Sequence, residues 1–473
     1  MSKIGTESNP LRVAIIGAGP TGFYTAEHLF RRKDVVVEVD MFERLPTPYG
    51  LVRYGVAPDH QKIKSVTKVY DRTAQKPGFR FFGNVELGKH VTVADLRHYY
   101  HQIVYTTGAQ TDRQLGIPGE DLKGSYPATE FVAWYNGHPD YCDYEVDLTQ
   151  ESAAVVGIGN VAMDVARILA RTPEELAKTD IADYALEALR QSKIKDIYVL
   201  GRRGPAQAKF TTPEIKELGE MQDAEVIVLP EEAELDEISQ AELANADRGT
   251  MSTVEIIQSY AGKELQGKSC RIHVRFLVSP VELIGDENGQ IVKMRLVKNE
   301  LYKTESGTSR PRATDQFEEI PVGLVFRSVG YRGVELPGVP FYDKWGVILN
   351  QEGRVVDPET NKPVLGEYTG GWIKRGPSGV IGTNKPDALE TVTHMLDDLA
   401  EGKVLEPIPS AAEAVLALIQ ERQPEFFTYE DWLSLNELEV AKGAESGRPR
   451  VKFTSVEEMK AALDKSRVPV AES

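Results

Sequence analysis

A glycine-rich segment near the N-terminus has the residue types and spacing that hold a nucleotide pyrophosphate. It follows the short apolar run 13–16, and its defining residues are Gly17, Gly19, Pro20 and Gly22. Glycines at this spacing permit a tight turn, let the backbone approach a pyrophosphate closely and let the next helix pack on the strand. The first N–H groups of that helix, expected from Phe23 to about Arg32, would point at the phosphates. The segment therefore predicts a dinucleotide site.

An acidic residue after the following strand completes this pattern. The run Val35–Phe42 is typical of a second buried strand, and Glu43 follows it, 21 residues after Gly22. A carboxylate at this distance accepts hydrogen bonds from a ribose whose hydroxyl groups are free. We interpret this site as one for a dinucleotide without a 2′-phosphate. The alternative is a structural glycine turn in an ordinary strand–helix–strand unit.

A second glycine-rich segment is followed by basic residues instead. The apolar run 153–156 leads into a GxGxxA pattern made by Gly157, Gly159, Asn160, Val161 and Ala162. The next expected strand, Ile197–Leu200, ends at Arg202 and Arg203. Guanidinium groups match phosphate oxygens, whereas a carboxylate would repel a ribose 2′-phosphate. We therefore assign this site to NADP(H); a solvated arginine pair at a strand end is the alternative.

Two other segments are candidates for lining a bound ring. Residues 44–60 are rich in Pro and Gly, yet they are apolar enough to be packed, which is typical of an irregular loop against a ligand. The alternative is a surface turn. Residues 368–383 form a third glycine-rich segment before an expected helix, 386–399, and Trp372 within it either stacks on a flat ring or belongs to the core.

The rest of the chain predicts further elements of an α/β protein. Expected helices cover residues 63–74, 94–101, 163–170 and 171–192. Expected strands cover residues 81–88, 102–109 and 324–331. Residues 272–276 and 293–297 alternate in the manner of antiparallel strands, with a turn at 285–289. From residue 406 the amphipathic helices 411–420 and 456–464 indicate a C-terminal extension on the domain surface.

Composition limits the classes of function. The chain has 473 residues, enough for two or three domains, and a net charge of −17, which argues against nucleic-acid and membrane binding. No stretch reaches about 18 consecutive apolar residues. The two cysteines, Cys142 and Cys270, form no CxxC pair, disulfide framework or metal-ligand cluster. The N-terminus lacks the pattern of a signal or transit peptide, so we expect a cytoplasmic protein.

Six segments, in this order, resemble those of the adrenodoxin-reductase-type ferredoxin–NADP reductases. They are IIGAGPTGFYTAEHLF, LVRYGVAPDHQ, WYNG, GIGNVAMDVARIL, VLGRRGPAQAKFT and GWIKRGPSGVIGT, and the resemblance spans about residues 11–402. It implies a bacterial member with an α/β fold of two Rossmann-like dinucleotide-binding domains, each with three layers around a parallel central sheet. The FAD-binding domain would be discontinuous, residues 1–112 and 332–473, with the NADP-binding domain, residues 113–331, inserted into it.

The resemblance also implies individual contacts. The implied FAD contacts are Gly19, Pro20, Glu43, Leu51, Val85, Trp372, Gly379, Val380 and Ile381. The implied NADP contacts are Gly159, Asn160, Val161, Ala162, Arg202, Arg203 and Glu214, with Gly379 near the nicotinamide. Glu214 departs from simple charge logic, because a carboxylate near a 2′-phosphate would instead orient the arginines or the ribose. His60 resembles a position near the flavin, where it either assists proton balance or is structural, and we assign no general acid or base.

The predicted activity is that of an FAD-dependent ferredoxin–NADP reductase. NADPH would pass a hydride to the flavin, and single electrons would go to a ferredoxin-type iron–sulfur protein or a flavodoxin. We expect a monomer without a metal site. The alternatives are a flavin-dependent NADPH oxidase or monooxygenase and a non-catalytic FAD-binding protein. A disulfide reductase would need a CxxC pair, and an amidotransferase-type flavin subunit would need cysteine clusters.

A ferredoxin partner predicts a basic docking face, because ferredoxins are typically acidic. One candidate group lies at the end of the first helix and comprises His28, Arg31, Arg32 and Lys33. Lys374 and Arg375, beside the third glycine-rich segment, are further candidates. The alternative for the first group is a favourable interaction with the dipole of its own helix.

Overall fold

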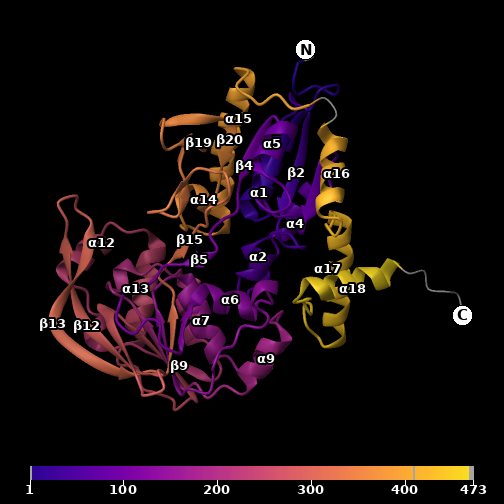
Figure 1. Cartoon of the computed structure of the whole chain (residues 1–473). Coiled ribbons are helices and arrows are strands. Elements are labelled where there is room, and N and C mark those ends of the chain that lie inside the picture. Colours follow the sequence, from indigo (N-terminus) through magenta and orange to yellow (C-terminus); the bar gives the residue numbers. More distant parts are fainter. Residues whose placement is uncertain (1–2, 409–410, 468–473) are drawn as a thin grey trace, which may run out of the picture. The chain divides into compact units, whose positions relative to one another are not determined.

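The chain divides into two compact units, one of which is inserted into the other. The structure is a computed structural model that describes residues 3–408 and 411–467 (Figure 1). Unit 1 comprises Met1–Val56, His60–Thr111 and Tyr331–Ser473, and unit 2 comprises Ala57–Asp59 and Asp112–Gly330. The two main division points lie one residue from the predicted boundaries after residues 112 and 331, and the assignment of residues 57–59 to unit 2 was not expected.

Unit 1 is built on a seven-stranded sheet. Its strands, in spatial order, are β18 (Asn350–Gln351), β19 (Arg354–Asp357), β20 (Lys362–Thr369), β4 (Gln102–Tyr105), β1 (Leu11–Ile16), β2 (Val37–Glu43) and β3 (Phe79–Gly83). The five strands from β20 to β3 are parallel, and β18 and β19 pair antiparallel at one edge. Strand β1 lies at the centre of the parallel part, which explains why almost every residue in it is apolar and buried.

Helices cover both faces of this sheet. Val13 and Ile15 of β1 pack with one set of helices, α1 (Pro20–Phe30), α4 (Thr67–Ala74), α15 (Asn384–Ala400), α17 (Tyr429–Glu445) and α18 (Val456–Arg467). Ala14 and Ile16 face the opposite way, toward the core formed with α5 (Val93–Tyr99), α16 (Ala411–Arg422) and the short strands β16 (Phe341–Tyr342) and β17 (Val347–Ile348). The result is the three-layer arrangement that the sequence predicts for a dinucleotide-binding domain.

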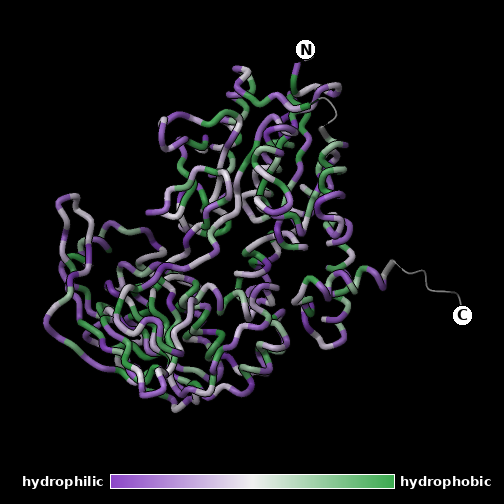
Figure 2. The backbone as a smooth tube through the Cα atoms, viewed as in Figure 1, coloured by the Kyte–Doolittle hydropathy of each residue, from purple (hydrophilic) through white to green (hydrophobic). Residues whose placement is uncertain are grey.

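Unit 2 contains a six-stranded sheet in which every pair is parallel. Its strands, in spatial order, are β6 (Ser125–Pro127), β14 (Leu324–Arg327), β7 (Ser152–Val156), β8 (Asp196–Leu200), β10 (Cys270–Arg275) and β9 (Ala224–Ile227). A separate antiparallel sheet consists of β11 (Val278–Gly285), β12 (Ile291–Lys303) and β13 (Ser309–Pro321). The hydrophobic stretches gather in the sheets of each unit, and the tip of the β12–β13 hairpin is hydrophilic (Figure 2).

The layers of unit 2 are helices, parallel sheet and antiparallel sheet. The helices are α6 (Ala128–Tyr135), α7 (Asn160–Ala170), α8 (Pro173–Leu176), α9 (Asp183–Arg190), α10 (Thr212–Gly219), α11 (Pro230–Ala233), α12 (Glu237–Leu243) and α13 (Arg248–Tyr260), with short 3-10 turns at Pro139–Tyr141 (η1) and Pro205–Gln207 (η2). The helices and one face of the parallel sheet form one core. The other face packs with the antiparallel sheet in a second core.

The expectation of an antiparallel strand at residues 272–276 was wrong. Strand β10 pairs parallel with both β8 and β9. Its alternation arises because Ile272 and Val274 enter the core, while Arg271 and Arg275 on the other face bind carboxylates, those of Asp196 and Glu232 among them. The two arginines of β10 therefore mark ion pairs, one buried at Arg275 and one with the 44% exposed side chain of Arg271.

Several unit 1 elements differ from the expected ranges. The expected helix 63–74 is broken into α3 (Gln61–Lys64) and α4, and the irregular segment 44–60 contains the single helical turn α2 (Leu51–Tyr54). The remaining short elements are α14 (Trp372–Arg375), η3 (Ile381–Thr383), β5 (Thr111–Asp112) and β15 (Tyr331–Arg332). Helix α17 was not anticipated at all. None of the helices in the described part of the chain combines the length and apolar character of a membrane span.

Candidate nucleotide-binding sites

The first glycine-rich turn lies between β1 and α1 and leaves open space at its middle glycine. Gly17 has a φ of 107°, and a Cβ atom there would lie 2.7 Å from the carbonyl oxygen of Thr106. A Cβ atom at Gly22 would lie 2.3 Å from the oxygen of Gly17. At Gly19, by contrast, an added Cβ would meet no protein atom within 4 Å. The polypeptide itself demands Gly17 and Gly22, whereas a glycine at position 19 is explained by a ligand that approaches the backbone closely.

The N-terminus of α1 is arranged to receive an anion. Gly19 is its N-cap residue and provides no side-chain cap, and Pro20 occupies the first helical position. Proline has no N–H to leave unsatisfied there, while the next N–H groups remain uncapped by any side chain. An uncapped helix start beside an open glycine fits a bound pyrophosphate.

Glu43 lies at the end of β2, where it also fastens the glycine turn. Its Oε2 accepts a hydrogen bond from the Ala18 N–H at 3.0 Å, and its Oε1 accepts one from the Leu45 N–H at 3.2 Å. Burial raises the pKa of Glu43, and these two N–H groups oppose the rise. Val85, which is 1% exposed, donates its N–H to the Glu43 carbonyl at 2.9 Å. The predicted ribose-binding carboxylate and Val85 are thus neighbours.

The third glycine-rich segment forms an open pocket in unit 1. The pocket is lined by Arg375, Ser378, Gly379, Thr383, Pro386, Asp387 and Glu390. The indole N–H of Trp372 donates to the Ser378 carbonyl at 3.1 Å, so this half-buried ring braces the loop that carries Gly379, Val380 and Ile381. Val380 is 53% exposed. An exposed apolar side chain beside a braced aromatic ring suits contact with a flat ligand.

The second glycine-rich turn, between β7 and α7, repeats the construction of the first. Gly157 has a φ of 139°, and its Cβ atom would lie 2.3 Å from the Ser328 carbonyl oxygen, while Gly159 again has no protein atom within 4 Å of an added Cβ. Gly159 is the N-cap of α7 and gives no side-chain cap. Asn160 accepts the Thr211 N–H at 2.9 Å and so ties the turn to the segment after β8. This site also fits a pyrophosphate.

The two turns differ in the charge that follows them. Arg202 is exposed and Arg203 half-buried, and neither guanidinium has a carboxylate partner in the described part of the chain. Burial, together with the neighbouring charge of Arg202, lowers the pKa of Arg203. The more distant charge of Glu242 opposes this lowering. The arrangement fits an anionic ligand such as a 2′-phosphate.

Comparisons with known proteins identify the family of this chain. The NADPH-ferredoxin reductase FprA of Mycobacterium tuberculosis is 45% identical over 458 residues, which cover 95% of this chain and 98% of that protein. This chain belongs to the adrenodoxin-reductase-type ferredoxin–NADP reductase family. The mitochondrial NADPH:adrenodoxin oxidoreductase of Arabidopsis thaliana is 38% identical over 465 residues, 96% of each chain. The solved structure of M. tuberculosis FprA in complex with NADPH matches with a TM-score of 0.91 and 44% identity, over 96% of this chain and 100% of that one.

The comparisons confirm the predicted family and the predicted α/β fold. They also support the predicted oxidoreductase chemistry and the predicted cofactors, FAD and NADP(H). A broader family model, that of the pyridine nucleotide-disulphide oxidoreductases, matches residues 11–202 of the reductase. Disulphide chemistry does not follow from that description. Cys142 and Cys270 are both free, and burial raises the pKa of the Cys270 thiol to about 12.

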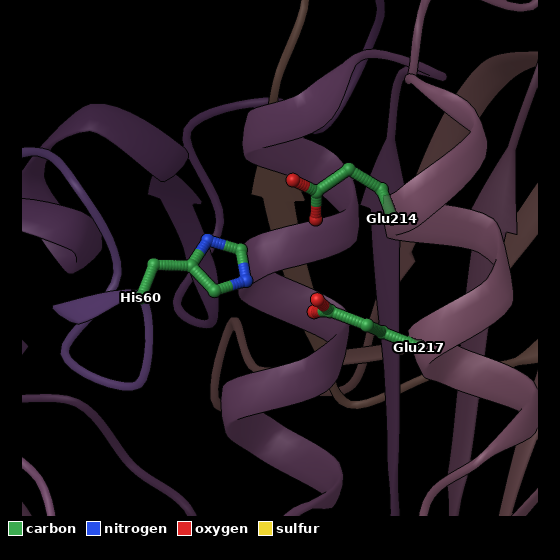
Figure 3. A group of neighbouring side chains, drawn as sticks. All are labelled: His60, Glu214 and Glu217. Carbon is green, nitrogen blue, oxygen red and sulfur yellow. The ribbon is translucent and has the colours of Figure 1, made fainter. Parts of the chain in front are cut away.

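Glu214 of the reductase occupies a buried ion-pair cluster rather than an open binding surface. Its Oε2 accepts a hydrogen bond from the guanidinium of Arg167 at 2.9 Å, and Arg167 is fully buried. Arg167 also binds Asp59 and Asp164. Figure 3 shows Glu214 and Glu217 projecting from the same face of α10. The arginine that Glu214 contacts is therefore Arg167, and no sequence pattern distinguishes Arg167 within its apolar helix.

The predicted contacts are distributed over both units. His60 is the N-cap of α3 in unit 1 and Leu51 is the first residue of α2, whereas Glu214 belongs to unit 2. The role of His60 stays a prediction. The assignment of individual residues to FAD and to NADP(H) likewise remains a prediction, with Gly19 and Gly159 as its best geometric support.

The basic residues expected at a docking face of the reductase are largely neutralised. Arg31 pairs with Glu27 at 2.5 Å and Arg32 with Asp34 at 2.8 Å. His28 is 8% exposed and contacts a backbone carbonyl. Two further candidates flank the third glycine-rich loop, where Lys374 is 9% exposed and binds carboxylates and Arg375 donates to the backbone and side chain of Ser378. The expectation of docking cations at positions 28 and 374 was wrong, because both side chains are buried and bind groups within unit 1.

Proposed function

We propose that this chain is an NADPH-dependent ferredoxin reductase that holds FAD in unit 1 and NADP(H) in unit 2. One observation carries this assignment. The two glycine turns have the same backbone design, with an open glycine at position 19 or 159. A carboxylate follows the first, and two guanidinium groups without an ion-pair partner among the described residues follow the second. Opposite charges at equivalent places distinguish a dinucleotide with free ribose hydroxyl groups from one that carries a 2′-phosphate.

The FAD site would be assembled from several segments of unit 1. The N-terminus of α1 would face the pyrophosphate, and Glu43 would accept hydrogen bonds from the adenosine ribose. Leu51, Val85 and the 379–381 loop would provide the remaining contacts. The chemistry that FAD supplies when bound is the acceptance of a hydride and the release of single electrons. The protein then has to bind and orient both nucleotides and exclude water from the reacting atoms.

The NADP(H) site would be selective because of its charge. Arg202 and Arg203 would bind the 2′-phosphate in charge-assisted, bidentate hydrogen bonds. Asn160, held by the Thr211 N–H, would keep the turn rigid beneath the pyrophosphate. NADPH is therefore the expected reductant, and NADH, which offers no phosphate to the two guanidinium groups, is expected to react poorly.

The partner and setting follow from the same proposal. We expect the electron acceptor to be a ferredoxin-type iron–sulfur protein, with a flavodoxin as a second substrate of the same kind. The reductase is expected to act as a monomer in the cytoplasm. No step requires a protein nucleophile, a metal ion or a thiol, which agrees with the burial of Cys270.

A steady-state assay tests this proposal. The purified yellow protein is mixed with NADPH or NADH and cytochrome c, with and without added ferredoxin. Rates that depend on both NADPH and ferredoxin support a ferredoxin reductase. Oxygen uptake without a response to ferredoxin would support an oxidase or monooxygenase instead, and absence of flavin reduction by either nucleotide would support a non-catalytic FAD-binding protein.

A further inference from the structure

The C-terminal region contains a carboxylate that is completely buried and fully paired. Glu439, on α17, has 0% side-chain exposure. Its carboxylate oxygens accept hydrogen bonds from both terminal nitrogens of Arg53, at 2.9 Å and 2.5 Å. It also accepts hydrogen bonds from Arg450 at 3.1 Å and from the Phe453 N–H at 2.9 Å. Burial acts to raise the pKa of Glu439, but Arg53 and these donors hold it below its ordinary value. A pair buried this deeply is costly to assemble and fixes the geometry around it.

The same face of α17 holds a second side chain of the 44–60 segment. The hydroxyl group of Tyr49 lies 2.8 Å from that of Tyr429 and accepts the indole N–H of Trp432 at 3.2 Å. Asp71 accepts hydrogen bonds from both tyrosines. The Trp432 ring also lies 5.0 Å from the guanidinium of Arg53. Helix α17 therefore grips the segment at two points four residues apart.

The gripped segment has a strained backbone. Tyr49 has a φ of 87°, in a region that non-glycine residues seldom adopt, and Gly50 follows with a φ of 49°. Such a conformation persists only where the surrounding structure over-determines it. The contacts from Tyr429, Trp432 and Glu439 hold this conformation in place, because they fix the Tyr49 ring and the helical turn that follows it.

The strained turn lies directly against the first glycine-rich turn. The Tyr49 N–H donates to the Ala18 carbonyl at 2.7 Å. A Cβ atom at Gly50 would lie 3.1 Å from the Cα of Gly19. A chain of contacts thus runs from α17 through Tyr49 and Gly50 to the residue whose open space fits a pyrophosphate.

We propose that the C-terminal segment 428–453 is a positioning element for FAD, holding the strained Tyr49–Gly50 turn against Gly19 so that the dinucleotide turn keeps its binding shape. The proposal rests on the assignment of FAD to unit 1. It gives a role to a region that the sequence presents only as a surface extension. The segment need not touch the cofactor, because it acts through the side chains of Tyr49 and Arg53.

The test measures FAD affinity, independently of NADPH oxidation. FAD is removed from the full-length protein, and its dissociation constant is measured by the quenching of flavin fluorescence on rebinding. We expect Glu439→Gln to raise this dissociation constant at least tenfold, because it leaves Arg53 buried without its counter-charge. Trp432→Phe, which keeps an aromatic ring and removes one donor, is expected to raise it about threefold to tenfold. The visible spectrum of bound flavin should also shift in both variants.

A matched control separates positioning from general stability. Asp398 is 7% exposed, lies in the same unit and pairs with Arg354 and the Tyr368 hydroxyl, without contact to the Tyr49–Gly50 turn. Asp398→Asn should lower the melting temperature yet leave FAD affinity and the flavin spectrum unchanged. Equal losses of affinity in Asp398→Asn and Glu439→Gln would overturn the proposal, as would native affinity and spectrum in both α17 variants. If the native protein itself bound no FAD, the proposed function would fail instead.

Discussion

Replacement of Arg203 by alanine should convert a nucleotide-selective enzyme into a weakly selective one. Arg203 is half-buried, and neither it nor Arg202 is paired with a carboxylate in the described ranges, so the guanidinium is free to bind a 2′-phosphate. Hydrogen bonds to charged groups contribute about 1.5–3 kcal/mol each. Loss of about 2–3 kcal/mol corresponds to a fall of roughly 30-fold to 150-fold in kcat/KM for NADPH.

The assay compares kcat/KM for NADPH and for NADH in the same variant. Arg203→Ala should change kcat/KM for NADH by no more than about twofold, because NADH has no 2′-phosphate for Arg203 to bind. Arg202→Ala should cost less, about tenfold for NADPH, since an exposed guanidinium is screened by solvent. Arg190→Ala, at an exposed position on α9, is the control and should change neither value. Equal losses for both nucleotides in Arg203→Ala, or a loss under threefold for NADPH, would refute the assignment of this site.

Three other predictions concern the turn, the thiols and the buried acid. Gly19→Ala should keep the native melting temperature and lose FAD affinity at least tenfold in a fluorescence titration. Gly22→Ala should instead destabilise the fold, because its Cβ would lie 2.3 Å from a carbonyl oxygen. Similar melting temperatures for the two variants would contradict this. A chain with both Cys142→Ser and Cys270→Ala should retain NADPH-dependent ferredoxin reduction. Loss of activity in the folded variant would show that a thiol takes part in the reaction. Burial raises the pKa of Glu43, so its contribution to the free energy of unfolding of the FAD-free protein is present at low pH and lost as pH rises through that pKa. Urea unfolding at about pH 5 and about pH 8 should therefore show a smaller loss for Glu43→Gln than for the native chain, and parallel losses would contradict this.

The glycine turns were predictable because local sterics dictate them. Gly17 and Gly157 must be glycine to adopt their positive φ angles and to pass close to the carbonyl oxygens of Thr106 and Ser328. The apolar runs before them are buried on both faces, which is typical of central parallel strands. Sequence spacing therefore identifies both strand–turn–helix units and the charge that follows each one.

Features that depend on distant partners were not predictable. Glu439 is one of many acidic residues in the C-terminal region, and its burial follows only from Arg53, 386 positions away. Arg167 is similar, because its position in an apolar helix gives no hint of the four carboxylates around it. The direction expected for strand β10 was wrong, since arginines that form ion pairs produce the same alternation as solvated residues do. In each case a charged residue looks exposed until the fold supplies its counter-charge.

An anaerobic two-step mixing experiment tests most directly whether the protein passes electrons from NADPH through FAD to ferredoxin. The FAD-loaded protein is first mixed with NADPH while the visible flavin absorbance is followed, and oxidised ferredoxin is added in the second step. A ferredoxin–NADP reductase should show rapid loss of flavin absorbance with NADPH, a much slower loss with NADH, and recovery of the absorbance as ferredoxin is reduced. Absorbance that recovers only with oxygen, or that NADPH never bleaches, would contradict the assignment as a ferredoxin–NADP reductase.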